Sequence, residues 1–368
     1  MRSILAGMLS RRGMLPALAL MACTPAPGDD ATTEPSTTSD TTTTATTTDA
    51  PTATTDAPTT TTAPDDDAWT LAVQLGQDRG ALLSVWGPAP DDVYAVGGQI
   101  TGVDTSFGVL YHFDGATWTE QPLPDGTPML HWTFGTGGDH WAVGRDGASL
   151  RREGDVWTPY PTGVTEILWG IWGAAPDDLW TVGGDGVDDD PVLVHWDGAA
   201  WTVTPLPDTG TSTGLFKIWG TGPADITAVG DRGLALHHDG ADWTVQPTND
   251  LADLISVWGR GPAEQLAVGG RANGRLARWD GAAWTGETLP IPGLSGVWMD
   301  PDGLATVVGM QGQIGRVAPG SLDFAPEESP TIQLLHAVFG FPGGPRFAVG
   351  GSLAGQPPYV GVIVQSGV

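Results

Sequence analysis

Residues 218–243 read IWGTGPADITAVGDRGLALHHDGADW, and this stretch holds every element of a unit that the chain repeats. An aromatic residue followed by Gly opens it, a Pro-Ala-Asp turn comes next, and a Val-Gly pair stands ten residues after the aromatic. A third apolar run ends at an Asp-Gly turn, and a Trp opens the last run. Asp-Gly between apolar runs is a strong hairpin signal, because Gly accepts a positive φ. The stretch therefore predicts four antiparallel strands.

The same unit recurs seven times. A Val-Gly pair follows each opening aromatic by nine or ten residues. The opening aromatics are Trp86, Phe134, Trp172, Trp219, Trp258, Trp298 and Phe339. One four-stranded sheet cannot cover both of its faces, so the units must stack on each other. Four-stranded units of this length are typical of propeller blades.

The two ends of the repeated region complement each other. The seventh unit stops at Val368 without a fourth strand, whereas residues 68–71 copy the fourth-strand pattern of residues 200–203. We therefore predict an all-β, seven-bladed β-propeller of four-stranded antiparallel blades over residues 68–368, closed by the N-terminal strand. The sixth unit lacks the Asp-Gly and Trp pattern, and residues 322–324 are expected to form its outer strand.

Residues 1–22 carry the features of an export signal. Arginines precede an apolar stretch at 14–22, which is too short to cross a bilayer core of about 30 Å. This stretch ends in Leu20-Met-Ala-Cys23, which resembles the lipobox of bacterial lipoproteins. The resemblance implies that Cys23 becomes the acylated N-terminus and that Thr24 after it favours the outer membrane. An ordinary signal peptide followed by a chance Cys is the alternative.

The segment after Cys23 has the composition of a tether. Residues 24–67 contain 19 Thr and nine acidic residues, with no Lys, Arg or aromatic residue. Such a segment cannot bury enough apolar surface to fold, so residues 23–67 are predicted to form a lipidated Cys plus a disordered Thr/Asp/Pro-rich tether. A flexible coil of this length spans roughly 35–40 Å. Tracts of this kind are also sites of O-glycosylation, which the composition leaves open.

Charge excludes several functions. The chain carries 43 acidic against 15 basic residues, a formal net charge of −28, and from Ala68 onward 34 acidic and 12 basic residues remain. Nucleic-acid binding requires a basic surface and is therefore excluded. Anionic headgroups repel such a domain, so we expect it to reach a membrane only through its N-terminal lipid. A single Cys excludes intramolecular disulfides and Cys-based zinc sites.

The repeat resembles two known types. It is similar to the Asp-box repeat of sialidase-like and photosystem II assembly-factor-like propellers. It also resembles kelch repeats, to whose pattern Gly97-Gly98, Tyr111 and Trp118 correspond. Both resemblances imply a propeller from Trp69 to the C-terminus and say little about function, since these repeats serve enzymes, adhesins and scaffolds alike.

The active-site residues known from such propellers have no counterparts in this sequence. Sialidases need three Arg around the substrate carboxylate and a Tyr–Glu nucleophile pair. The chain has four Tyr, and two of them occupy repeat strand positions. Kelch-type copper oxidases use a Cys–Tyr cross-link, and the one Cys here is Cys23. No catalytic residues are therefore predicted.

Most Trp and His residues fit the repeat. Trp columns at fixed repeat positions predict packing between blades. Trp132 and Trp169 fall outside these columns, near the loops that enter inner strands, and are the better ligand candidates. His112, His195 and His237 each precede a turn Asp by two residues, a place that Arg takes in other blades. This exchange predicts pairing with carboxylates rather than metal binding.

Acidic residues gather in two loops. Asp185, Asp188, Asp189 and Asp190 lie between the second and third strands of the third blade, and Asp104 lies in the corresponding loop of the first. Dense carboxylates on Gly-rich loops suit Ca²⁺, which takes six to eight oxygen ligands. Their spacing departs from that of a calcium-binding loop, so a solvated acidic loop is the alternative.

One end of the ring is the more variable. The loops between second and third strands share this end with the connections between blades, and they differ in length: Gly97–Gly108, Gly183–Pro191, Gly269–Gly274 and Gly350–Pro358. Binding residues tend to lie on loops held by a rigid scaffold, so we expect the ligand at this end. Lys217, the one Lys of the chain, stands two residues before an opening aromatic, where most units carry a small residue. It is expected to place a charge at the mouth of the channel.

These observations lead to one main hypothesis. The chain is interpreted as a monomeric, lipid-anchored propeller of the bacterial outer envelope, facing the periplasm or the cell surface, that binds a protein or a glycan without catalysis or cofactor. The alternative is a propeller hydrolase or lyase that acts on envelope polysaccharide through loop acids such as Asp104 and Asp188. A spacer without a ligand is the third interpretation.

Overall fold

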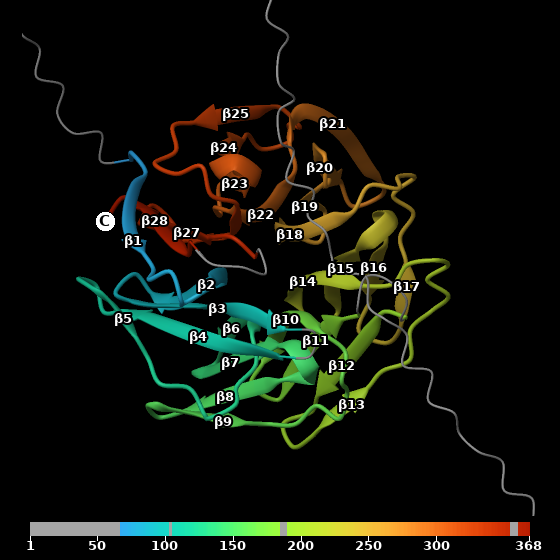
Figure 1. Ribbon diagram of the computed structural model, residues 1–368. Coiled ribbons are helices and arrows are strands. Elements are labelled where there is room, and N and C mark those ends of the chain that lie inside the picture. The colour runs from blue at the N-terminus through green and yellow to red at the C-terminus, as the bar shows by residue number, and fades with distance from the viewer. Residues whose placement is uncertain (1–66, 103–104, 185–189, 354–359) are drawn as a thin grey trace, which may run out of the picture. The chain divides into compact units, whose positions relative to one another are not determined.

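The computed structural model describes residues 67–102, 105–184, 190–353 and 360–368. These residues form seven four-stranded antiparallel sheets arranged as the blades of a propeller (Figure 1). In six of the sheets the strands follow chain order from the inside outward, whereas in the seventh the N-terminal strand is outermost. Consecutive inner strands contact each other around the ring. The predicted seven-bladed all-β fold is confirmed.

The first three blades run as follows. Blade 1 comprises β2 (Ala81–Ala89), β3 (Asp92–Gly102), β4 (Thr105–Phe113) and β5 (Trp118–Glu120). Blade 2 comprises β6 (Leu130–Thr136), β7 (Asp139–Gly144), β8 (Ser149–Glu153) and β9 (Val156–Pro159), with the 3₁₀ turn η1 (Arg145–Gly147) between β7 and β8. Blade 3 comprises β10 (Leu168–Ala175), β11 (Asp178–Gly183), β12 (Val192–Trp196) and β13 (Trp201–Val203).

Blades 4 to 6 repeat this order. Blade 4 comprises β14 (Leu215–Gly222), β15 (Asp225–Gly230), β16 (Ala235–His238) and β17 (Trp243–Val245), with η2 (Asp231–Gly233) after β15. Blade 5 comprises β18 (Leu254–Gly261), β19 (Glu264–Gly269), β20 (Asn273–Trp279) and β21 (Trp284–Pro292). Blade 6 comprises β22 (Leu294–Met299), β23 (Ala305–Gly309), β24 (Ile314–Val317) and β25 (Phe324–Glu327), with η3 (Met310–Gly312) after β23.

Blade 7 joins the two ends of the chain. Its strands are β26 (Leu335–Gly340), β27 (Arg346–Gly350), β28 (Val362–Ser366) and, outermost, the N-terminal β1 (Thr70–Gln74). The predicted closure by the N-terminal strand agrees with the pairing of β1 and β28, in which Thr70 faces Gln365. Arg346 fastens this seam, because its buried guanidinium donates to Ser366 Oγ at 2.7 Å and lies over the Trp69 ring at 5.1 Å.

Two sequence expectations need correction. The outer strand of blade 6 is β25, which shares only Phe324 with the predicted 322–324, because Ser321 and Asp323 bond to each other in a turn. The stretch Gly97–Gly108 is largely a hairpin extension of β3 and β4, whose pairing continues from Gly97 and Val109 to Gly102 and Thr105. The predicted loop is therefore paired strand over most of its length, and residues 103–104 lie outside the described ranges.

The repeated turns and Trp residues behave as predicted. At each Asp-Gly turn the Asp carboxylate accepts two backbone N–H groups, as Asp239 does from Ala241 and Asp242. The Trp that opens each outer strand packs on the blade before it. Trp201 of blade 3 lies 5.5 Å from Trp141 of blade 2, and Trp243 of blade 4 lies 5.4 Å from Trp180 of blade 3, between ring centroids. These Trp residues stabilise the packing between neighbouring blades.

Several expectations concern residues outside the described ranges. They include the signal and tether residues 1–66, with Cys23, and four of the five loop acids, Asp104, Asp185, Asp188 and Asp189. Within the described ranges, no helix has the length and apolar character needed to cross a membrane.

Candidate functional site

The opening aromatics form a ring at the end where the first and second strands of each blade join, here called the hairpin end. Neighbours in this ring touch, with centroid distances of 5.8 Å for Trp86–Phe134 and 6.4 Å for Trp219–Trp258. In blades 2, 4, 5 and 7 the Gly after the aromatic makes room for the indole of the preceding blade. A Cβ on Gly220 would lie 2.9 Å from the Trp172 ring, well inside van der Waals contact. The aromatic–Gly pair is thus a device for packing one blade on the next.

Blade 6 departs from this device. Met299, rather than Gly, follows Trp298, and its side chain is buried. Trp258 of blade 5 reaches past blade 6 to Phe339 of blade 7, at 6.1 Å between ring centroids. Trp258 and Phe339 are half-buried, as are Trp86 and Phe134 elsewhere in the ring. The ring of aromatics is therefore irregular at blades 5 to 7.

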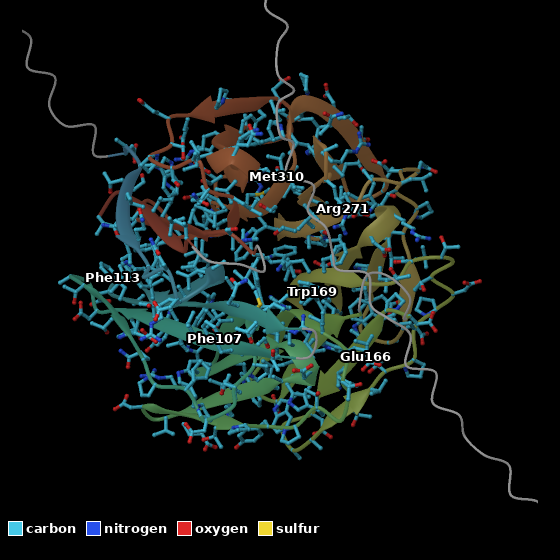
Figure 2. The ribbon with its side chains drawn as sticks, viewed as in Figure 1. Phe107, Phe113, Glu166, Trp169, Arg271 and Met310 are labelled. Atoms are coloured by element: carbon cyan, nitrogen blue, oxygen red, sulfur yellow. The ribbon has the colours of Figure 1, made fainter. Side chains whose placement is uncertain are left out.

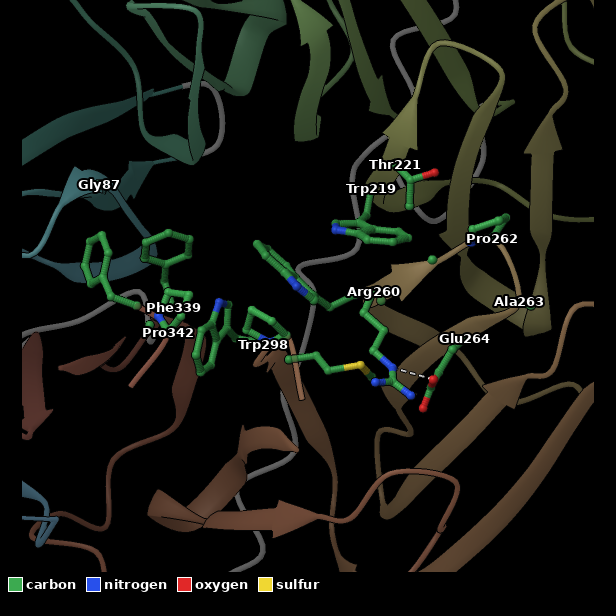
Figure 3. A pocket seen from close by; sticks show the side chains of 18 of the residues that line it. Gly87, Trp219, Thr221, Arg260, Pro262, Ala263, Glu264, Trp298, Phe339 and Pro342 are labelled. Atoms are coloured by element: carbon green, nitrogen blue, oxygen red, sulfur yellow. Dashed lines mark hydrogen bonds and ion pairs between the residues drawn. The ribbon is translucent and has the colours of Figure 1, made fainter. Parts of the chain in front are cut away.

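A hollow of about 930 Å³ opens at this irregularity, and we call it the aromatic hollow (Figure 3). It is lined by side chains from blades 4 to 7 and by Gly87 and Pro88 of blade 1. Its aromatic and proline lining is Trp219, Trp258, Trp298, Phe339, Phe341, Pro88, Pro262, Pro301 and Pro342. The charged lining residues, Arg260 and Glu264, pair with each other at 2.5 Å. The hollow is thus apolar and nearly neutral in a strongly acidic chain.

The opposite end of the inner strands, where the blades connect to each other, is the connector end. Here every inner strand carries a β-bulge directly after a buried Leu, as between Leu168 and Gly170 of β10. The bulged residues are Leu83, His131, Trp169, Phe216, Ile255, Ser295 and His336. A bulge redirects a side chain, which frees these positions from the packing rule of the repeat. Their chemistry accordingly differs from blade to blade.

Three of the sequence-predicted candidates meet at the connector end. Trp169 lies near the centre of the ring of blades (Figure 2) and stacks on His131, with 4.3 Å between ring centroids. Lys217 Nζ lies 3.3 Å from the centroid of the Trp132 ring and donates to the Trp169 carbonyl oxygen at 3.3 Å. The structure therefore brings Trp132, Trp169 and Lys217 into one cluster, contributed by blades 2, 3 and 4.

In this cluster, the pKa values of Lys217 and of the neighbouring histidines are shifted so that the neutral forms are favoured. Burial lowers the pKa of Lys217 well below its usual value. Burial, and then the charges of Arg145 and Lys217, lower the pKa of His131 to about 3. Burial, together with the charge of Lys217, lowers the pKa of His336 to about 4, although a hydrogen bond to the Gly351 carbonyl opposes this shift. Both His residues are therefore neutral at neutral pH.

The remaining candidates form no such cluster. Of the four acids proposed for calcium, Asp190 is described, and it lies exposed just before β12. Asp104, Asp185, Asp188 and Asp189 fall outside the described residues. In the ranges that the structure describes, no group of three or more His, Cys, Asp or Glu side chains is placed to hold a metal ion.

The expected pairing of strand histidines with carboxylates is confirmed. The distance from Nε2 to the carboxylate oxygen is 2.7 Å for His112–Asp92 and 2.8 Å for His195–Asp178. His237 pairs with Asp225 at 3.0 Å, and Arg151 with Asp139 at 2.8 Å in the blade that carries Arg. These residues fasten the third strand to the start of the second and have a structural role.

Sequence reasoning missed the aromatic hollow and placed its aromatics among packing residues. The available signal was Met299, since it breaks the aromatic–Gly pairing in a single unit. It also missed the bulged positions, although a Leu precedes each of them: Leu82, Leu130, Leu168, Leu215, Leu254, Leu294 and Leu335. Met299 is a departure from the repeat, whereas the Leu is a constant position within it. Neither is a functional motif by itself.

Comparison with known proteins agrees on the fold. No protein-family model matches the chain, and no curated protein is similar to it in sequence. Among solved structures it is similar to YCF48 from Cyanidioschyzon merolae, with a TM-score of 0.60 and 14% identity over 81% of this chain and 98% of that one. YCF48 bound to D1 peptide gives a TM-score of 0.60 and 13% identity, covering 83% and 99%.

A third similar structure is the WD40 β-propeller domain of Doa1, with a TM-score of 0.59 and 10% identity, covering 81% of this chain and 97% of that one. At such low identity these likenesses establish the propeller fold alone.

Proposed function

We propose that this protein is a lipid-anchored, non-enzymatic propeller of the bacterial cell envelope that binds a protein partner through a peptide segment seated in the aromatic hollow. The observation that carries the proposal is the hollow itself. It is the place where Met299 interrupts the aromatic–Gly pattern, and the half-buried Trp258 and Phe339 line its volume of about 930 Å³. Exposed aromatic side chains in a concave, apolar site are typical anchors of binding.

The lining favours a peptide over a glycan. A sugar presents several hydroxyl groups, each of which needs a hydrogen-bond partner when it is buried. The hydroxyl and charged side chains of the hollow are already engaged, since Thr221 Oγ1 donates to Asp225 at 2.5 Å and Arg260 pairs with Glu264. Apolar contact remains, which suits proline and aromatic side chains of an extended segment. The solved complex of YCF48 with D1 peptide supports a peptide as ligand by analogy of fold.

The proposed location rests on the N-terminal sequence. The apolar stretch ending at Cys23 supports lipidation, and the Thr-rich segment up to residue 67 supplies a spacer. The domain carries 34 acidic and 12 basic residues, so anionic headgroups repel it and the lipid would provide the membrane attachment. Replacing Cys23→Ser is expected to move the chain from the membrane fraction to the soluble fraction. Unchanged membrane association of that variant would contradict the anchor.

Selection of a displayed peptide library on the full-length chain tests the ligand. We expect it to enrich segments with proline and aromatic residues. Trp258→Ala should weaken their binding at least tenfold, or about 1.4 kcal/mol, because it removes an aromatic face of the hollow. Leu251→Ala is the matched control, since Leu251 is 84% exposed on the connection between blades 4 and 5 and lies outside the hollow.

Two outcomes would contradict this assignment. Selected peptides that bind Trp258→Ala as tightly as the unaltered chain would locate the ligand elsewhere. An oligosaccharide array that gives saturable binding lost in Trp258→Ala, with no peptide selected, would make the ligand a glycan.

A further inference from the structure

The second site concerns Lys217 and is independent of the aromatic hollow. Lys217 is the single Lys of the chain, and its side chain is nine-tenths buried on β14. Its ammonium has three N–H donors. Trp169 O accepts one of them and the face of Trp132 lies against Nζ. Across the described residues no carboxylate lies within 4.0 Å of Nζ, in a domain where acids outnumber bases almost threefold.

Among the described residues, the titratable groups on which the Lys217 charge acts are basic. His131 on β6 and His336 on β26 lie close enough for the Lys217 charge to act on both, and Arg145 of η1 acts on His131. His131 Nδ1 is buried and has no hydrogen-bond partner. Arg271 lies at the rim over Phe216, where it pairs with Asp253. Basic groups therefore collect at this place although the domain as a whole is acidic.

Lys217 and Trp132 each stand two residues before an opening aromatic. The other inner strands carry small residues at this position, so no bulky group from it crowds Lys217 and Trp132. These small residues are Ser84, Gly170, Ser256, Gly296 and Ala337. Packing space there is set by backbone, as shown by Gly170, whose Cβ would lie 3.2 Å from Lys217 Cα. None of these five residues is titratable, so the inner strands β2, β10, β18, β22 and β26 add no acid from this position.

We propose that Lys217, with Trp132 beneath its amine and His131 beside it, is the anchor of a site for a small oxyanion, of the carboxylate or phosphate class, at the connector end of the propeller. A buried amine without a counter-ion is unfavourable, and an anion supplies the partner that the described residues do not. The Trp132 face and the Trp169 carbonyl hold the amine in position before the anion arrives. The unpartnered Nδ1 of His131 provides a second polar contact, as a donor once that nitrogen carries a proton.

Anion binding at this site is linked to protonation. In the absence of an anion, burial keeps the pKa of Lys217 low, which favours the neutral amine. An oxyanion favours the ammonium, so binding takes up a proton and raises the pKa. Affinity should therefore fall as the pH rises above the pKa of the anion-bound Lys217.

The single Lys makes the site directly measurable. Reductive methylation of the full-length chain with ¹³C-formaldehyde labels amines, and the signal that Lys217→Met removes belongs to Lys217. We expect its titration midpoint to lie well below 10.5 without anion. Acetate or inorganic phosphate should raise the midpoint saturably by at least one unit, while chloride at equal ionic strength should not. The more effective of the two anions identifies the class of ligand.

Calorimetry on the unlabelled chain provides a measurement that does not depend on methylation. Titration with the same anions in two buffers of different ionisation enthalpy should show proton uptake. Lys217→Met should lose at least tenfold in affinity, and Lys217→Arg, which restores the charge, should recover part of it. Trp258→Ala should leave anion binding unchanged, which separates this site from the hollow. Absence of any saturable effect of either anion, or equal binding by folded Lys217→Met, would overturn the proposal.

Discussion

The two ends of the same seven inner strands are built by different rules. At the hairpin end six of the seven blades carry the aromatic–Gly pair, and the hollow opens where Met299 replaces the Gly in blade 6. At the connector end each strand carries a β-bulge, and the seven bulged side chains range from Leu83 to His131 and Trp169. One end thus acquires a site by a single departure from a strict pattern. The connector end acquires its site because the β-bulge in every inner strand exempts the bulged side chain from the packing that the repeat imposes.

The largest expected loss of stability comes from substituting the Gly that follows an opening aromatic at the hairpin end. A Cβ at Gly220 would lie 2.6 Å from the Asp225 carbonyl oxygen and 2.9 Å from the Trp172 ring. Neither the backbone nor the enclosed indole can move freely, so Gly220→Val should lower the free energy of unfolding by about 3 kcal/mol or more. Urea-induced unfolding followed by Trp fluorescence measures this loss.

Gly222 provides the matched control on the same strand. A Cβ there would meet no atom within 4 Å. Gly222→Val should therefore change the free energy of unfolding by less than about 0.5 kcal/mol, as substitutions away from packed features do. Equal stability of the two variants would show that the Gly after the opening aromatic is not needed for packing, and the contrast between the two ends would lose its basis.

The sequence predicts one of these ends better than the other. Repetition made the aromatic–Gly pair, the Asp-Gly turns and the closing strand visible, because each recurs at a nearly fixed distance. Even the pairing of His112 with a carboxylate followed from the exchange of His for Arg between blades, and the structure identifies that carboxylate as Asp92. A bulge is marked only by the constant Leu before it, since the residue that it redirects, such as Trp169 or His336, is the one that varies.

The candidate sites show the same limit. Trp132, Trp169 and Lys217 were selected separately, because each departed from its column, and the fold brings them together across blades 2 to 4. Their proximity depends on how neighbouring blades pack against each other. The residue spacing within a single repeat unit does not reveal this packing. The aromatics of the hollow obey the pattern, so their exposure became visible only once Met299 was placed beside Trp258 in space.

A smaller effect is expected at the connector end, where pH should reveal the buried His131. Its pKa is about 3 in the folded chain and 6.5 in its ordinary, exposed state. Between these values the unfolded chain binds a proton that the folded chain does not. The contribution of His131 to stability is therefore complete above about pH 6.5, falls as the pH decreases, and levels off below about pH 3. At pH 5 the loss amounts to about 2 kcal/mol.

His131→Phe isolates this contribution, because Phe keeps an aromatic ring against Trp169 and cannot take up a proton. The free energy of unfolding of both chains, measured at pH 7.5 and pH 5, should fall less in the variant. His140 and His336 also have a low pKa, about 3 and about 4, and remain in the variant, so part of the acid dependence persists. An identical fall in both chains would mean that His131 is charged in the folded state. The connector end would then hold a protonated His131 beside the Lys217 amine, and burial would not keep its groups neutral.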